Sequence, residues 1–246
     1  MNESYLLHTE RCPQCARVGH DRSGNNLAVY SDGHSYCYCC GWLSGSDILS
    51  SYLHKNDVKQ RQHEVYLPSD CDTTYPAKAI QWMGQYELDK YTMLSHNLLW
   101  SEQQQRLIFP VYDSKGLQMW CGRYFGQAKE PKWKIIGDKS KVDYILGVGD
   151  KLVIVEDVVS AIKLSKYYRA MPIFGSFIGN IRFKRLKTML ESTDKVFIWL
   201  DPDKRKEAII EQRRASLLGL DCHVIISEKD PKEEDYEKFR RILNEV

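Results

Sequence analysis

The chain has 246 residues, of which 43% are hydrophobic, and a formal net charge of +2. This length suffices for one large domain or two smaller ones, and the near-balanced charge excludes a global polycation, so any nucleic-acid surface must be local. No run of eighteen apolar residues occurs, and the N-terminus lacks the pattern of a signal peptide. We therefore expect a cytoplasmic protein without a membrane span, in which eight cysteines favour metal ligands over disulfides.

Residues 1–48 contain two C-x-x-C motifs, Cys12-Pro-Gln-Cys15 and Cys37-Tyr-Cys-Cys40, separated by 21 residues. Zinc prefers four tetrahedral ligands, which two such motifs supply when they close a hairpin. The separation is one residue longer than the usual range, and the loop at 19–26 can absorb the difference. Because the segment has little core of its own, a structural zinc would supply most of its folding free energy, on the order of 10 kcal/mol. The spacing favours Cys40 over the other possible ligands, which are Cys39, His20 and His34.

A hairpin is predicted between the two motifs. Residues 27–30 and 35–36 have the pattern of strands, and the turn at 31–34 joins them. Asp32 and His34 lie at the tip, where a ribbon would contact a partner. The Asp-Gly sequence has a structural explanation as a turn, whereas His34 has none.

The next region has a polar linker followed by apolar and basic segments. Residues 49–65 are polar and are predicted as a linker. Between positions 76 and 97, apolar residues recur at helical spacing and are expected to form core. Residues 106–113 and 117–123 are predicted as two strands joined by a tight turn.

Basic and aromatic residues are interleaved after these strands. Arg123 is followed by Tyr-Phe, and Lys132 and Lys134 flank Trp133. Such a pattern can offer phosphate clamps and a stacking face for single-stranded nucleic acid. The same alternation also describes a solvated strand with one buried side chain, so the segment alone does not decide between the two.

The C-terminal region predicts a parallel sheet. Residues 152–155 and 196–200 are continuous apolar runs rich in β-branched side chains, and a helical pattern follows each. Such runs suit strands that are buried on both faces. Further strands at 171–174 and 222–226 complete four strand-and-helix repeats. A mixed-charge helix with a solvated face is expected at 228–241.

Acidic residues follow three of these strands: Glu156, then Asp201 and Asp203, then Asp230. In strand-then-helix units, chemistry collects beyond the carboxyl ends of the strands. Converging carboxylates would repel one another without a divalent cation between them, and oxygen ligands suit magnesium or manganese. Alternatively, each acid only caps a helix, as Asp201 before a proline is well placed to do.

Taken in order, these features resemble the phage-type and bacterial DNA primases with a TOPRIM domain, over nearly the whole chain. The resemblance implies an α/β fold with an N-terminal zinc ribbon, an α+β half-domain and a TOPRIM-type parallel-sheet domain. The boundaries that it implies are a zinc ribbon at 1–48, a linker at 49–65, the N-terminal half of an RNA polymerase (primase) domain at 66–149, and a TOPRIM domain at 150–246.

Particular motifs carry this resemblance. The sequence 31–37 is similar to the ribbon of phage primase-helicases, which implies that Asp32 and His34 help to read the template trinucleotide. Arg106–Gly122 is similar to a hairpin of the family. The basic residues that match those holding template or nucleotide phosphates are Arg123, Lys132 and Lys134.

The acidic residues resemble the TOPRIM motifs. Glu156 matches the family's glutamate, Asp201 and Asp203 its metal-binding pair, and Asp230 its third acidic motif. The resemblance implies template-directed synthesis of short RNA primers on single-stranded DNA, in which a 3′-hydroxyl attacks the α-phosphate of a ribonucleotide and pyrophosphate leaves. The first three residues would be catalytic, and all four would hold magnesium or manganese.

One motif departs from the family. Where the family has Glu-Gly-x-x-Asp-Ala, this chain has Glu156-Asp157 and then Ser160-Ala161. A serine hydroxyl is a poor ligand for a hard dication, so either Asp157 compensates or the metal site is weakened. We expect Asp157 to act as a charge at the helix N-terminus and to point away from the site, because it directly follows the strand-end glutamate.

The expected partners are a single-stranded DNA template, ribonucleoside triphosphates and a separate replicative helicase, because the sequence stops where phage bifunctional proteins continue into a motor. A phage-encoded protein would act in the cytoplasm of its bacterial host. Two alternatives remain: a TOPRIM-type nuclease or strand-passing enzyme, and a catalytically impaired single-stranded-DNA-binding module. Assays with labelled nucleotides and labelled DNA separate the three.

Overall fold

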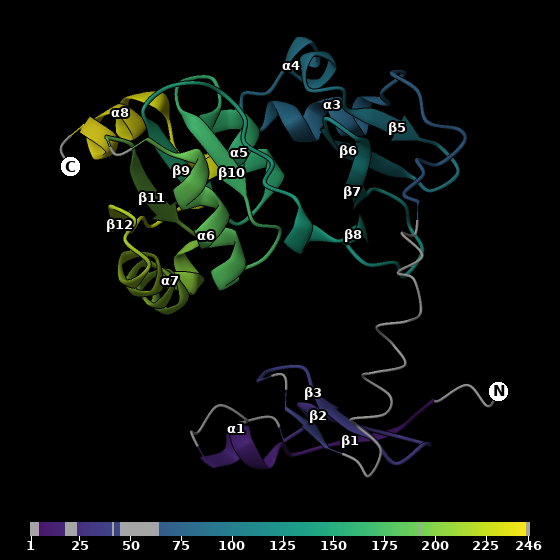
Figure 1. Cartoon of the computed structure of the whole chain (residues 1–246). Coiled ribbons are helices and arrows are strands. Elements are labelled where there is room, and N and C mark those ends of the chain that lie inside the picture. The colour runs from purple at the N-terminus through teal and green to yellow at the C-terminus, as the bar shows by residue number, and fades with distance from the viewer. Residues whose placement is uncertain (1–4, 18–23, 41, 45–63, 192, 245–246) are drawn as a thin grey trace. The chain divides into compact units, whose positions relative to one another are not determined.

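The computed structural model describes residues 5–17, 24–40, 42–44, 64–191 and 193–244. The chain divides into two compact units, Met1–His63 and Glu64–Val246 (Figure 1). The predicted linker at 49–65 lies outside the described residues except for its last two. The domain boundaries predicted from the sequence therefore stay predictions.

The N-terminal unit contains a four-stranded antiparallel sheet in the order β1-β2-β3-β4. Its strands and its one described helix are β1 (Leu6–Glu10), α1 (Pro13–Arg17), β2 (Leu27–Tyr30), β3 (Ser35–Cys37) and β4 (Leu43–Ser44). The predicted hairpin is confirmed, and Gly33 takes the positive φ of 83° that its turn requires. The buried cluster here is small and consists of Cys12, Cys15, Leu27 and Cys37.

The second unit begins with two helices that pack on an antiparallel sheet. The helices are α3 (Ala77–Gly84) and α4 (Lys90–Ser95), and the sheet consists of β5 (Leu99–Ser101), β6 (Arg106–Asp113), β7 (Gly116–Tyr124) and β8 (Trp133–Gly137). The segment between 76 and 97, whose apolar residues have helical spacing, therefore forms two helices and the turn between them. Asp89 begins the second, because its carboxylate accepts a hydrogen bond from the Thr92 amide. Met83, Leu88 and Phe109 are fully buried in the shared core.

A parallel sheet in the order β10-β9-β11-β12 completes this unit. Its strands are β9 (Lys151–Val155), β10 (Arg169–Pro172), β11 (Lys195–Trp199) and β12 (Cys222–Val224). The helices that accompany it are α5 (Val158–Leu164), α6 (Asn180–Met189), α7 (Arg205–Leu217) and α8 (Tyr236–Asn244), with short 3₁₀ turns η1 (Lys139–Lys141), η2 (Pro202–Lys204) and η3 (Pro231–Glu233). The predicted fold class is confirmed.

Alternate residues of the central strands face opposite sides of the parallel sheet, as the strand period requires. Leu152 and Val196 belong to a core that α6 and α7 cover, whereas Val153 and Phe197 belong to a core that α5 and α8 cover. Both faces are therefore buried, which explains why these strands read as continuous apolar runs. Figure 1 shows the four helices around this sheet.

Helix α5 belongs to two cores at once. Val159 and Ile162 pack with the helices and strands of the antiparallel sheet, while Ala161 and Leu164 pack against the parallel sheet. All seven residues of the helix are buried. The two sheets of this unit are thus joined through one short helix, whose N-terminus lies beside the carboxyl ends of the parallel strands.

One predicted helix differs from the structure. The prediction of a single solvated helix at 228–241 is wrong, because Pro231 begins a 3₁₀ turn and α8 starts only at Tyr236. Proline lacks an amide hydrogen and suits the first position of such a turn. Phe239 and Leu243 are fully buried on α8, so the helix also contributes to the core. No helix among the described residues is long and apolar enough to cross a membrane.

Candidate active site and metal centre

The four cysteines of the two C-x-x-C motifs come together in the N-terminal unit. The ligand atoms of Cys12, Cys15, Cys37 and Cys40 all lie within 4.8 Å of one another. Among the described residues, no other group of three or more His, Cys, Asp or Glu side chains is gathered so closely. Cys39 is exposed and lies outside the group, and His20 falls outside the described residues.

Local backbone geometry prepares this cluster for a metal. The amides of Cys15 and Cys40 each point at the first sulfur of their motif, at 3.5 Å from Cys12 Sγ and Cys37 Sγ. Although burial raises the pKa of Cys37, the amides of Cys40 and Cys39 outweigh it and lower that pKa to about 7. Burial raises the pKa of Cys15. Four closely spaced sulfurs, with amides aimed at two of them, fit a structural zinc site.

The tip of the ribbon holds an ordered polar group. Asp32 Oδ1 accepts a hydrogen bond from the His34 amide at 3.2 Å and also lies 2.5 Å from Nδ1 of the His34 imidazole. The imidazole stacks on Tyr30, with ring centroids 4.3 Å apart and planes 9° from parallel. Tyr30 in turn shares a 2.6 Å hydrogen bond with Tyr38. The imidazole is thus fixed in orientation while one third of the His34 side chain stays exposed.

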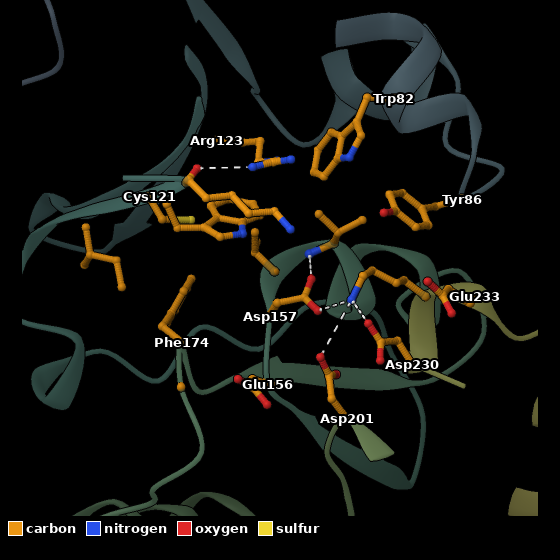
Figure 2. A pocket seen from close by; sticks show the side chains of 17 residues that line it. Trp82, Tyr86, Cys121, Arg123, Glu156, Asp157, Phe174, Asp201, Asp230 and Glu233 are labelled. Carbon is orange, nitrogen blue, oxygen red and sulfur yellow. Dashed lines mark hydrogen bonds and ion pairs between the residues drawn. The ribbon is translucent and has the colours of Figure 1, made fainter. Parts of the chain in front are cut away.

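A cavity of about 420 Å³ lies at the carboxyl ends of the parallel strands (Figure 2). Glu156 follows β9, Asp201 follows β11 and Asp230 follows β12, and all three line it. Strand order explains the convergence, because β11 pairs with both β9 and β12. The opposite wall comes from α3, β7 and β8 of the antiparallel sheet.

Burial shifts the pKa of two acids of the cavity, Glu156 and Asp201. Burial raises the pKa of Glu156, and it raises the pKa of Asp201 to about 7, although Lys232 opposes the latter shift. Glu156 Oε2 and Asp201 Oδ1 are buried and have no hydrogen-bond partner among the described residues. Two such oxygens, at neighbouring strand ends, suit a hard divalent cation.

Asp157 lines the same cavity. Its Oδ1 accepts hydrogen bonds from the amides of Val159 and Ser160, at 2.8 and 3.1 Å, so the predicted position at the N-terminus of α5 is confirmed, and the side chain caps the helix there. The prediction that it points away from the site is wrong, because its Oδ2 lies 3.1 Å from Lys232 Nζ. Asp157 thus belongs to the acidic cluster of the cavity, which consists of Glu156, Asp157, Asp201 and Asp230. Ser160 is fully buried and donates its hydroxyl to Asp157 Oδ2 at 2.9 Å.

Asp203 does not join the cluster. It lies in the η2 turn, its side chain is 71% exposed, and it pairs with Lys204 at 2.8 Å. That pairing lowers the pKa of Asp203. The Asp-x-Asp motif thus places one acid in the cavity and one outside it, so the metal-binding role predicted for Asp203 stays a prediction.

The opposite wall of the cavity is basic and aromatic. Arg123 lies over the Trp82 ring, 5.3 Å from its centroid, and Trp133 meets Trp82 edge-on at 6.1 Å. Lys132 and Tyr86 also line the cavity. Figure 2 shows Trp82, Tyr86 and Arg123 facing the acids across the open space. The cavity therefore offers aromatic faces and positive charges opposite its carboxylates.

Lys134 lies apart from this wall. It follows Trp133 on β8 and consequently points to the other face of the sheet, where its ammonium lies 5.9 Å from the Trp120 ring. The sequence thus grouped three basic residues of which the structure brings two to the cavity.

Sequence reasoning missed Trp82, Tyr86 and Lys232. The two aromatic residues are on or just after α3, and at helical spacing they are indistinguishable from core residues. Lys232 comes two residues after Asp230, and its proximity to a strand-end acid was the signal that could have identified it. Burial of its charge is outweighed by the carboxylates around it, so the pKa of Lys232 is raised.

No protein-family model matches the sequence, and no curated protein matches it. Among solved structures, the chain is similar to the zinc-binding and RNA polymerase domains of the Aquifex aeolicus primase, with a TM-score of 0.58 and 14% identity over 100% of this chain and 79% of that one. It is also similar to the primase fragment of the bacteriophage T7 primase-helicase protein, with a TM-score of 0.51 and 16% identity over 98% of this chain and 99% of that one. At such identities these likenesses concern the fold. The chain therefore has the fold of the zinc-binding and RNA polymerase domains of primases.

Proposed function

We propose that the protein is a DNA primase, which synthesises short RNA primers on single-stranded DNA by metal-dependent nucleotidyl transfer. The observation that carries this proposal is the cavity in which strand-end carboxylates face a basic and aromatic wall. Such a cavity matches a ribonucleoside triphosphate, which has a base to stack and phosphates to neutralise. The fold shared with primase domains supports the same reading.

In this proposal Glu156 and Asp201 hold a divalent cation, magnesium or manganese, through their unpartnered oxygens. When bound, such an ion lowers the pKa of the attacking hydroxyl and neutralises charge on the transferring phosphoryl group. Asp201, with a pKa of about 7, ionises near neutral pH. Glu156, whose pKa is raised by burial, is alternatively suited to accept the proton of the hydroxyl.

The opposite wall would bind the substrates. Arg123 and Lys132 hold phosphates of the triphosphate or the template, by electrostatics and positioning. Trp82, Tyr86 and Trp133 offer faces on which bases stack, a contact worth about 1–3 kcal/mol per base. We assign Lys134, outside the cavity, to the template backbone.

The ribbon would select the start site. We propose that zinc, held by the four cysteines, fixes the hairpin, and that Asp32 and His34 contact template bases at its tip. Asp32 holds the imidazole in one orientation, as a base-reading group needs. Base-edge contacts of this kind carry sequence discrimination, whereas phosphate contacts do not.

Primer synthesis tests the proposal. The zinc-loaded chain is incubated with labelled ribonucleotides, magnesium or manganese, and a library of single-stranded templates. We expect short RNA products from the wild type and none from Asp201→Asn. Asp221→Asn is the matched control, because its side chain is 60% exposed at the amino end of β12 and pairs with His223.

Other results would replace the proposal. Cleavage of labelled DNA without nucleotide incorporation would identify a nuclease with the same metal centre. Salt-sensitive DNA binding with neither activity would identify a non-catalytic single-stranded-DNA module. A separate helicase partner and a cytoplasmic location are part of the proposal, and co-purification with a helicase would test the former.

A further inference from the structure

Lys232 lies in the middle of the acidic cluster. Its Nζ is 2.6 Å from Asp230 Oδ2, 3.1 Å from Asp157 Oδ2 and 3.9 Å from Asp201 Oδ2. In Figure 2, dashed lines from these three acids meet at one amino group. Its side chain is only 14% exposed. The ammonium group of Lys232 thus occupies the place where the carboxylates of Asp157, Asp201 and Asp230 converge.

The fold holds this lysine in place. Lys163 of α5 is itself 5% exposed, and its Nζ donates a hydrogen bond to the Lys232 carbonyl at 3.1 Å. The neighbouring Pro231 is buried and starts the η3 turn. Asp157 is fixed in turn by the two amides that it caps. Both partners of the Lys232–Asp157 ion pair are therefore positioned by backbone contacts, unlike a surface lysine that meets an acid by chance.

The cluster consequently does not fit two divalent cations. Glu156 Oε2 and Asp201 Oδ1 are available to one ion. The carboxylate oxygens that a second ion would need, on Asp157 and Asp230, already contact the ammonium. An ion between them would have to displace Lys232 or lie against its positive charge, which is strongly unfavourable in a partly buried site.

We propose that Lys232 is a built-in cation that replaces one divalent ion, so that the acidic cluster binds a single divalent cation through Glu156 and Asp201. The inference rests on the proposed function only for the binding of a divalent cation. Asp157 and Asp230 then serve as positioning residues, which hold the ammonium and do not ligate metal. The fixed charge stays in the site at every stage, whereas a bound ion exchanges with solvent.

Counting bound Mn²⁺ tests this directly. The zinc-loaded full chain is titrated with Mn²⁺ in the absence of nucleotide and DNA, and free Mn²⁺ is measured by electron paramagnetic resonance. Sites in the cluster are those lost when Asp201→Asn and Asp230→Asn are introduced together into the same protein. We expect one such site in the wild type and in Lys232→Arg, and two in Lys232→Met, which keeps the length of the side chain without its charge.

Two further variants separate the position of Lys232 from simple charge. Lys204→Met removes a nearby positive charge that pairs with Asp203 outside the cavity. The number of Mn²⁺ sites in the cluster of this variant is expected to stay at one. Asp157→Asn is expected to change the affinity of the wild-type site less than twofold, whereas a tenfold loss would make Asp157 a metal ligand and overturn the assignment.

The outcomes distinguish the inference from the proposed function. Two sites in the wild type, or one site in a folded Lys232→Met, would overturn the role of Lys232 and leave metal-dependent synthesis intact. No site in the wild type would count against the metal chemistry of the proposed function itself. If Lys232→Met does not fold without metal, Mn²⁺ is expected to restore its folding, and a variant that stays unfolded at saturating Mn²⁺ would contradict the proposal.

Discussion

Replacing Asp201 with asparagine is expected to change how the stability of the protein depends on pH. Burial raises the pKa of this carboxyl from 3.8 to about 7 in the folded protein. That difference in pKa corresponds to a change in the free energy of unfolding of roughly 4 kcal/mol at most. Because the side chain is 22% exposed, solvent screens part of it, and we expect about 2 kcal/mol.

The sign follows from the protons bound in each state. Between pH 3.8 and about 7, Asp201 is ionised in the unfolded chain and still holds its proton in the folded one. The folded state binds more protons in this window, so the free energy of unfolding falls as pH rises and levels off above about pH 7. Without magnesium or manganese, the wild type therefore loses about 2 kcal/mol relative to Asp201→Asn between pH 4 and pH 8.

Urea denaturation across this pH range measures the effect. The zinc-loaded proteins are kept in buffers that contain no magnesium and no chelator, because a chelator would strip the cysteine site. Asp203→Asn is the matched control from the same turn, since that exposed acid has a lowered pKa and predicts no such loss. Parallel stability curves for the wild type and Asp201→Asn would refute the reasoning, as would a failure of magnesium to restore wild-type stability at pH 8.

Three other predictions concern the ribbon and α5. Elemental analysis is expected to find one zinc per chain and none in Cys15→Ser/Cys37→Ser, and metal removal should unfold the ribbon while hydrogen exchange in the second unit is unchanged. His34→Ala is expected to reduce the free-energy difference between preferred and other primer start sites by about 1–3 kcal/mol, with little change in non-specific DNA affinity. A uniform loss of binding would mean that the imidazole only supports the turn. Ser160→Asp is expected to lower the free energy of unfolding by roughly 3 kcal/mol, because it buries a second carboxylate beside Asp157; an unchanged urea midpoint would contradict this.

The central strands of the parallel sheet could be predicted because their burial on both faces determines which residues they contain. A strand that is covered on both faces is apolar at nearly every position. The runs at 152–155 and 196–200 have this composition. The strand-end acids followed from the same rule, since the carboxyl ends of parallel strands share one edge of the sheet. The strand positions alone therefore predicted that Glu156, Asp201 and Asp230 share one edge of the sheet, and the strand order, in which β11 pairs with both β9 and β12, brings them together there.

The direction of individual side chains could not be predicted in this way. Asp201 and Asp203 are two residues apart, yet a 3₁₀ turn sends one into the cavity and the other into solvent. Asp157 both caps α5 and pairs with Lys232. The alternation of side chains along a strand does not predict this, because Asp157 lies beyond the end of β9. In each case the deciding factor is the local turn, which depends on a few backbone angles.

The aromatic wall was hidden for a different reason. Trp82 has the spacing of a core residue on α3, and it does pack against Tyr86 and Phe125. Only the docking of the two sheets reveals that the same side chain also faces the acids. A residue that is part core and part site has no separate signature in a single sequence.

The burial of α5 limits how the protein can vary. A side chain that grows or shrinks at any position from Val158 to Leu164 meets close packing on every side, so the change must be absorbed in the antiparallel sheet, the parallel sheet, or both. The exposed helix face that usually tolerates substitution is missing here. We therefore expect saturation mutagenesis to find this helix the least tolerant in the second unit, including positions such as Ala161, whose side chain packs in the core of the parallel sheet.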